Sequence, residues 1–110
     1  MKHKVINLTI PSGSDYISGK LNLEEGRVVA CALLTDSTPN IPVNIKLEDS
    51  GNDILHPYVS YKEFQPTNGN HFDSRKKLDF DGNQDVLVFA KSNTALDTDF
   101  TFQLLFYIEK

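Results

Sequence analysis

The sequence predicts an all-β fold, a two-sheet antiparallel β-sandwich of about eight strands. The hydrophobic pattern has a period of two residues: Ile6, Leu8 and Ile10 alternate with polar residues, and the segments 41–48 and 100–108 do the same. Clusters of Gly, Pro, Asn, Asp and Ser separate these runs at regular intervals, as expected for turns between short strands. No segment shows the 3.6-residue period of a helix of about ten residues.

Each expected strand ends at a turn cluster, such as Pro11-Ser-Gly-Ser14 after the first strand and Glu24-Glu-Gly26 after the second. Two runs, 28–34 and 86–90, are apolar on both faces, so we expect central strands that are covered on both sides or by a partner chain. A jelly roll is favoured, and the alternative is an immunoglobulin-like sandwich, although the Trp and paired Cys of immunoglobulin domains are absent. The expected strands are 4–10, 16–23, 27–35, 41–48, 54–63, 75–80, 85–91 and 99–109.

The length of 110 residues predicts a single domain, 1–110. Cys31 is the sole cysteine, which forbids an internal disulfide, and its apolar surroundings predict a buried core residue. The N-terminus lacks the unbroken apolar run of a secretory signal, and no stretch approaches the ~20 apolar residues of a membrane span. We therefore expect a protein made in a reducing cytoplasm without a signal peptide, and no membrane contact.

The net charge is −4, whereas a surface that neutralises phosphates is usually basic. The basic cluster Arg75-Lys-Lys77 lies between Asp73 and Asp79, which is typical of a solvated edge or turn. We expect no nucleic-acid partner.

Asp79, Asp81 and Asp85 lie within seven residues and invite comparison with a calcium loop. An EF-hand needs glycine at its sixth position and glutamate at its twelfth, and counting from Asp79 these positions do not match. Asp81-Gly82 between two alternating runs is instead a strong signal for a hairpin turn. An irregular calcium site at the three aspartates is the minor alternative. The stretch 49–53 is interpreted in the same way, as a hairpin turn.

Sequence motifs for catalysis are absent. The chain has no Gly-x-Ser-x-Gly elbow, P-loop or Gly-x-Gly-x-x-Gly, and His3, His56 and His71 lack zinc-type spacing. A sandwich of this size also has little room for a deep pocket. We therefore expect a non-enzymatic protein without a cofactor. His71, in the long loop 65–74, is the one histidine that we would test for function.

A carbohydrate- or ligand-binding β-sandwich module is the alternative function. Sugar recognition usually needs exposed flat aromatic rings, and this chain has no Trp. Tyr58 and Tyr61 are three residues apart, so a regular strand would point them to opposite faces. The loop 65–74 could bind a ligand, but no motif argues for it.

Taken as a whole, the chain from Lys4 to the strand Phe100-Thr-Phe-Gln-Leu-Leu-Phe-Tyr-Ile-Glu109 resembles the small jelly-roll or sandwich proteins that decorate or build phage virions. The resemblance lies in the number of strands, the Gly/Asn/Asp turns and the long aromatic C-terminal strand. It implies a capsid decoration or auxiliary protein located in the virion, with no catalytic residues. It also implies contacts with other virion subunits, above all the major capsid protein, and a homotrimer or other cyclic contact.

The last strand suggests where such contacts lie. Leu105 and Tyr107 make its second face partly apolar, so either the chain itself or another subunit must cover them. Loops carry function when a rigid scaffold positions them, which adds the loop 65–74 with His71 and Phe72. The predicted interface residues are Leu105, Tyr107, His71 and Phe72.

Overall fold

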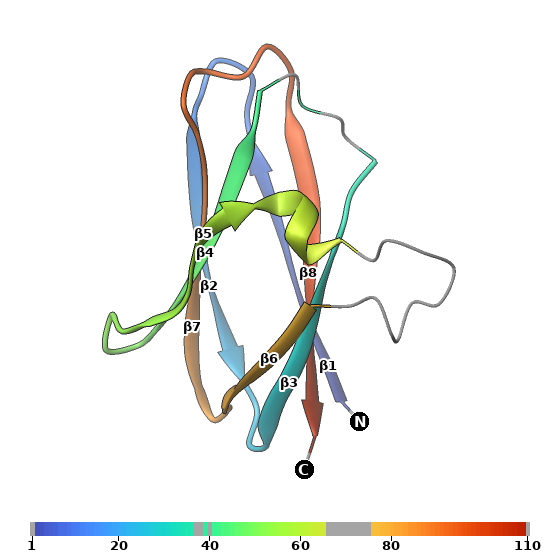
Figure 1. Cartoon of the computed structure of the whole chain (residues 1–110), viewed down its shortest axis with the longest axis vertical. Coiled ribbons are helices and arrows are strands. Elements are labelled where there is room, and N and C mark those ends of the chain that lie inside the picture. The colour runs from blue at the N-terminus through green and yellow to red at the C-terminus, as the bar shows by residue number, and fades with distance from the viewer. Residues whose placement is uncertain (1, 37–38, 40, 66–75, 110) are drawn as a thin grey trace.

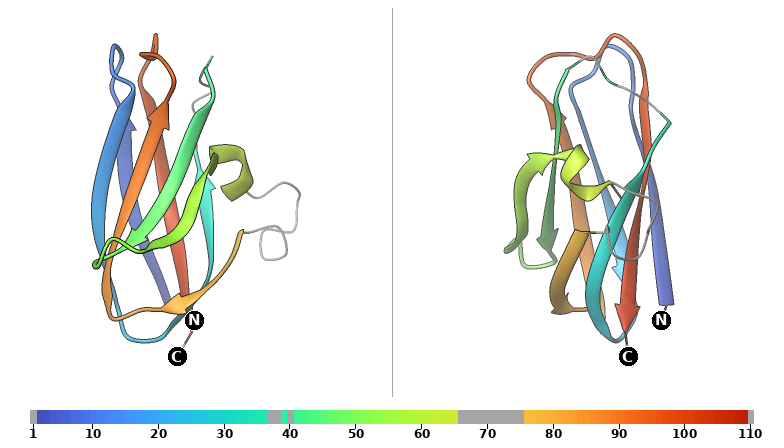
Figure 2. Two further views of the ribbon diagram at one scale, coloured as in Figure 1. Left: turned by 60° about the vertical axis from the view of Figure 1, so that its left-hand side comes forward. Right: turned by 45° about the vertical axis from the view of Figure 1, so that its right-hand side comes forward.

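The computed structural model describes residues 2–36, 39, 41–65 and 76–109, and it is an all-β sandwich of two four-stranded antiparallel sheets (Figure 1). One sheet has the strand order β1-β8-β3-β6 and the other β2-β7-β4-β5. Figure 2 shows the sheets as two layers. The strands are β1 (Lys2–Ile10), β2 (Tyr16–Leu23), β3 (Arg27–Leu34), β4 (Val43–Asp49), β5 (Ile54–Ser60), β6 (Lys76–Asp81), β7 (Gln84–Ser92) and β8 (Phe100–Glu109).

This order is that of a jelly roll. Consecutive strands change sheet at every step except β4–β5, which pair as a hairpin. The jelly-roll prediction is confirmed, and the immunoglobulin-like alternative has a different strand order. Seven of the eight strands begin and end within two residues of the expected bounds.

The core lies between the sheets and is built by the alternating side chains of the strands. In β8, Phe100, Phe102, Leu104, Phe106 and Ile108 are all buried, because every second side chain of a strand points to the same face. The central position of the two apolar runs is confirmed, since β3 lies between β8 and β6, and β7 between β2 and β4. Residues 30–33 of β3 are buried on both faces, whereas Leu87 and Phe89 on the outer face of β7 are only half-buried.

Cys31 belongs to this core and is fully buried, as the sequence predicted. Burial raises the pKa of its thiol far above the usual range, which keeps the sulfur in its unreactive protonated form.

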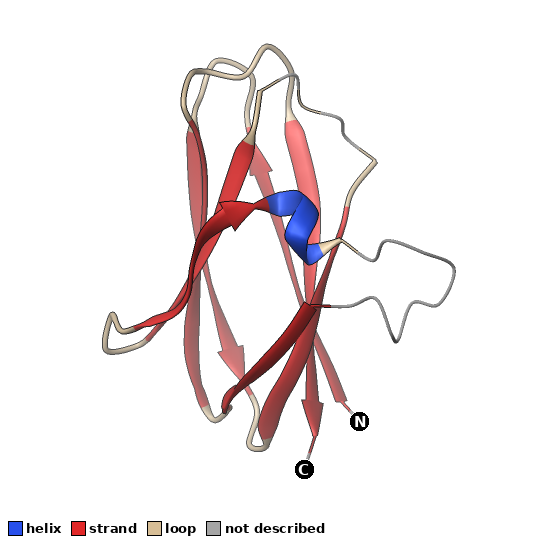
Figure 3. Ribbon diagram, in the orientation of Figure 1, coloured by secondary structure: helices blue, strands red, loops and turns tan. Residues whose placement is uncertain are grey.

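The expected strand 54–63 is wrong at its C-terminal end. β5 stops at Ser60, and Tyr61–Phe64 form one turn of 3₁₀ helix, η1, drawn in blue in Figure 3. The Ser60 hydroxyl accepts a hydrogen bond from the Lys62 amide and caps the turn. The turn buries Tyr61 and Phe64 on one side, because residues three apart in a 3₁₀ helix lie above one another.

The expected hairpin at Asp81-Gly82 is also wrong, because β6 and β7 belong to different sheets. The turn carries the chain across the sandwich and is fixed by the neighbouring β2–β3 turn: the Gly82 amide donates to the Gly26 carbonyl and the Asn83 amide to the Glu24 carbonyl, both at 2.8 Å. A turn signal is local and reports where a strand ends, but it does not report which sheet the next strand joins.

The turn at 49–53, by contrast, is the predicted hairpin between β4 and β5. Asp49 Oδ1 accepts hydrogen bonds from the amides of Gly51 and Asp53, each at 2.9 Å, and Asn52 has a positive φ of 66°. The Asp49 carboxylate is thus hydrogen-bonded to the backbone of its own turn.

Most of the long loop 65–74, with His71 and Phe72, lies outside the described residues. In the part of the chain that is described, no helix has the length and apolar character needed to cross a membrane.

Candidate functional site

The outer face of the β1-β8-β3-β6 sheet carries an apolar row of three side chains. Val5, Leu105 and Ala32 lie side by side on β1, β8 and β3, since Val5 pairs with Leu105 and Leu105 with Ala32. Directly paired side chains are close enough to touch, so the row is continuous. Val5 is 41% exposed, Leu105 is half-buried and Ala32 is fully buried, so Val5 and Leu105 supply the accessible surface of the row. We call these three residues the apolar row.

Tyr107 lies on the same outer face, two residues from Leu105, but it is only 3% exposed. It packs in a small cluster with Ala30 and Ala32, and the His3 ring meets it edge-on with ring centroids 4.8 Å apart. Because its own chain covers Tyr107, little of this side chain is accessible to a partner. Whether Leu105 and Tyr107 contact another subunit stays a prediction, and His71 and Phe72 lie outside the described residues.

The three aspartates of the minor calcium interpretation are not brought together. Arg27 Nε lies 2.6 Å from Asp79 Oδ1, and its Nη1 lies 2.5 Å from Asp81 Oδ1. Asp85 is on the other sheet, where it accepts a hydrogen bond from Asn22 Nδ2 at 3.0 Å. Within the described residues, no group of three His, Cys, Asp or Glu side chains is placed to hold a metal ion.

Arg27 also sets the electrostatics of this corner. Its hydrogen bond and charge lower the pKa of the Asp79 carboxyl, while Asp79 and Asp81 raise the pKa of the guanidinium. The site is an exposed network of ion pairs in which the Arg27 guanidinium is the cation. The aspartates that suggested a calcium site in the sequence therefore form salt bridges with Arg27 instead.

The outer face of the β2-β7-β4-β5 sheet carries aromatic side chains interleaved with charges. Phe89 on β7 pairs with Ser18 on β2 and with Lys46 on β4. One step along the strands, Lys91 on β7 pairs with Tyr16 on β2. We call this surface the aromatic face, and its members are Tyr16, Ser18, Lys46, Glu48, Tyr58, Phe89 and Lys91.

Lys46 holds the centre of the aromatic face. Its Nζ lies 5.0 Å from the ring centroid of Tyr58 and 4.8 Å from that of Phe89, both within reach of a cation–π interaction. Glu48 Oε2 lies 2.7 Å from the same nitrogen and raises the pKa of Lys46. The lysine is thus fixed between two rings and a carboxylate.

The Tyr16 and Tyr58 rings are accessible, whereas Phe89 is half-buried. Tyr16 is 43% exposed and Tyr58 38% exposed, and the Tyr16 and Phe89 ring centroids are 6.4 Å apart. Tyr58 is exposed whereas Tyr61 is buried, but the strand argument does not explain this, because Tyr61 belongs to the 3₁₀ turn η1. The sequence did not reveal Tyr16 and Phe89 as surface neighbours, because Phe89 lies in a run that is apolar on both faces and Tyr16 stands at the edge of a turn.

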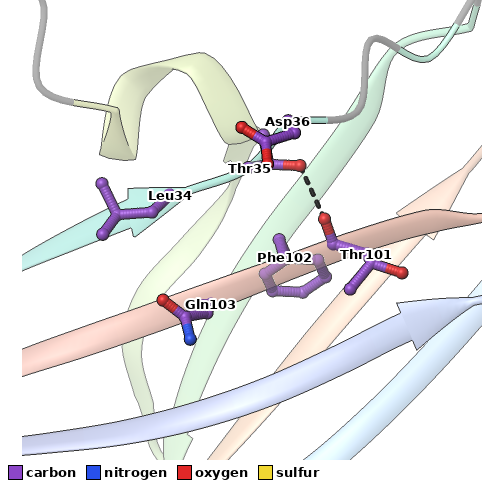
Figure 4. Close-up of a pocket in the computed structure, with 6 residues that line it drawn as sticks. All are labelled: Leu34, Thr35, Asp36, Thr101, Phe102 and Gln103. Carbon is purple, nitrogen blue, oxygen red and sulfur yellow. Dashed lines mark hydrogen bonds between the residues drawn. The ribbon is translucent and has the colours of Figure 1, made fainter.

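A pocket of about 320 Å³ lies where β3 ends beside β8 (Figure 4). The Thr35 hydroxyl donates to the Thr101 carbonyl across it at 2.6 Å. Among the described residues that line it, Asp36 is the one acidic or basic side chain. Its described lining residues are Leu34, Thr35, Asp36, Thr101, Phe102 and Gln103.

The fold places the chain among the jelly-roll β-sandwich proteins. No protein-family model matches it, and no curated protein sequence matches it. Among solved structures, the Yersinia pseudotuberculosis-derived mitogen is similar over 99% of this chain and 87% of its own, with 11% identity and a TM-score of 0.53. The pre-peptidase C-terminal domain of a Bacillus anthracis collagenase is similar over 93% and 87%, with 13% identity and a TM-score of 0.51.

Phage capsid proteins are also among the structural neighbours. The capsid structure of Helicobacter pylori bacteriophage KHP30 is similar over 96% of this chain and 95% of its own, with 10% identity and a TM-score of 0.39. At such identities the two likenesses with TM-scores above 0.5 show the β-sandwich fold alone and do not extend to function.

Proposed function

We propose that this chain is a non-enzymatic interaction protein, a phage virion component of the capsid decoration or auxiliary type, that acts through protein–protein contacts. The observation that carries the proposal is the apolar row Val5, Leu105 and Ala32 on the outer face of the β1-β8-β3-β6 sheet.

An antiparallel sheet that faces water normally carries polar side chains on its outer face. Here Val5 is exposed and Leu105 is half-buried, and Leu34 is exposed two residues beyond the buried Ala32 on β3. Contiguous apolar side chains that remain outside the core mark surfaces used for association. The contact surface is thus the broad face of a rigid sheet.

The proposed occupant of this face is another virion subunit: a second copy in a cyclic trimer, or the major capsid protein. The two accessible members of the row, Val5 and Leu105, lie on β1 and β8, which pair from Lys2–Ile108 to Ile10–Phe100. A contact there would join subunits without disturbing the core, because the core residues of β8 point to the other side.

The test is the solution mass, measured by light scattering on a size-exclusion column over a concentration series. We expect a discrete cyclic oligomer that Leu105→Asp dissociates, since a charge in the row would have to be desolvated on association. Asn7→Asp is the matched control: it adds a charge to the same face of β1, two residues beyond Val5, at an exposed position outside the row.

Val5→Asp provides a second variant in case Leu105→Asp perturbs folding, because Val5 is substantially exposed. A wild-type protein that stays monomeric at all concentrations, with Leu105→Asp and Val5→Asp behaving like Asn7→Asp, would overturn self-association through this face. A mass that changes equally in all three variants would show that the row is not the contact.

A further inference from the structure

The aromatic face lies on the opposite side of the sandwich from the apolar row and is independent of the proposed function. It crosses the whole β2-β7-β4-β5 sheet, with Tyr58 on β5, Lys46 on β4, Phe89 on β7 and Ser18 on β2. Neighbouring strands are about 4.8 Å apart, so the face extends roughly 14 Å across the sheet, the length of a short oligosaccharide.

The side chains on this face combine two kinds of contact. The exposed Tyr16 ring, with the half-buried Phe89 ring beside it, offers flat apolar surface, while the Ser18 hydroxyl and the Tyr16 hydroxyl offer hydrogen bonds. A ligand that fits must therefore have an apolar face and a polar edge on the same ring. A pyranose sugar has this character, because its axial C–H bonds line one face and its hydroxyls line the rim.

The charged side chains on this face restrict further the class of ligand that could bind. Lys46 is neutralised by Glu48, and Lys20 lies 3.8 Å from Asp85 on the same sheet face. Lys91 is exposed, and the described part of the chain gives it no carboxylate partner. Its register partner is Tyr16, so one free ammonium group stands next to the most exposed ring of the face.

The single unpaired lysine beside the Tyr16 ring favours a ligand with one negative charge over a ligand with a row of negative charges. Single-stranded nucleic acid also stacks on aromatic side chains, but it needs a row of cations that follows its phosphates. Among the described residues on the outer face of this sheet, Lys20 and Lys46 are already paired with carboxylates, and the chain as a whole is acidic. One carboxylate on one sugar ring matches the arrangement better than a phosphate backbone does.

We propose that the aromatic face binds an acidic oligosaccharide, with a sugar ring stacked on Tyr16 and Phe89 and its carboxylate paired with Lys91.

The experiment is isothermal titration calorimetry of the full chain with α-1,4-linked trigalacturonate, a sialylated trisaccharide and the neutral galactotriose of matched length. We expect at least one acidic trisaccharide to bind more tightly than the neutral one. Tyr16→Ala should weaken binding of the acidic ligand by about tenfold, since it removes the stacking surface. Lys91→Gln should remove the preference for the acidic ligand over the neutral one.

The matched control is Lys77→Gln, which removes an equally exposed lysine from the β6 strand of the other sheet and should leave affinity unchanged. Tyr16 and Lys91 are both exposed, so neither substitution should unfold the chain, and thermal melts check this. The proposal is overturned if neither acidic trisaccharide binds at millimolar concentration, or if binding survives both Tyr16→Ala and Lys91→Gln. Binding of an oligo-dT strand that competes for the same face would overturn it in favour of nucleic acid.

Discussion

A Cβ atom at Gly82 would lie 2.3 Å from the carbonyl oxygen of Glu24, closer than any real Cβ contact. The β6–β7 turn and the β2–β3 turn therefore pack backbone against backbone at one end of the sandwich. The Gly82 amide donates to Gly26 and the Asn83 amide to Glu24, so the two turns also share hydrogen bonds. This contact joins two connections that are far apart in the sequence and that each cross between the sheets.

Gly82→Ala is expected to destabilise the fold by at least about 2 kcal/mol, because the obstructing atom belongs to the backbone and cannot rotate away. For a domain of this size that corresponds to a fall of roughly 10 °C in the melting temperature. Gly51→Ala is the control, since its Cβ would meet only the Asp49 side chain at 3.4 Å. Equal melting temperatures for the two variants would show that the turn contact can relax at little cost.

Tyr107→Ala is expected to cost about 2–4 kcal/mol, although Tyr107 points away from the main core. The reason is that Tyr107 is 3% exposed and fills the small cluster with Ala30 and Ala32. Gln103→Ala, an exposed position on the same face of the same strand, should be close to neutral. Urea unfolding followed by circular dichroism gives both values. A loss below about 1 kcal/mol for Tyr107→Ala would instead mark the ring as available to a partner.

The ion pairs that Glu24 forms with Lys2 and Lys4 make the free energy of unfolding depend on pH. The hydrogen bond and charge of Lys2, followed by the charge of Lys4, lower its pKa below the ordinary value of 4.5. Lys2 Nζ lies 3.1 Å from Glu24 Oε2, and Lys4 Nζ lies 3.6 Å from Oε1. Because the folded pKa is depressed, the stabilisation is complete above the unfolded pKa and is lost as the pH falls through the folded pKa.

Glu24→Gln should therefore melt at a lower temperature than the wild type at neutral pH, and the difference should vanish at pH values below the lowered pKa. The effect is expected to be small and to shrink with added salt, because all three side chains are exposed to water. Glu25→Gln is the control at the neighbouring exposed position. A gap between wild type and Glu24→Gln that stays constant down to strongly acidic pH would contradict the prediction.

The strands themselves were predictable because their signals are local. The two-residue period of β8 placed Phe100 to Ile108 on one buried face, and the apolar runs identified β3 and β7 as central strands. The turn residues indicated where the strands end, because Gly, Asn and Asp adopt the backbone conformations of turns at a lower cost in free energy than most other residues. The end of β5 was missed because Tyr61 and Phe64, three residues apart, fit a strand about as well as a single 3₁₀ turn.

The sequence by itself determined that the chain folds as an all-β sandwich, where its strands run, and that Cys31 is buried. Only the tertiary structure decided that the turn at Asp81-Gly82 crosses between the sheets and that Arg27 forms ion pairs with both Asp79 and Asp81. It also decided that Tyr16, Lys46, Tyr58 and Phe89 meet on one surface. Hydrophobic period and turn chemistry act between residues near in sequence. The aromatic face is assembled from four strands, and its members become neighbours only when long-range pairing sets the order and register of those strands.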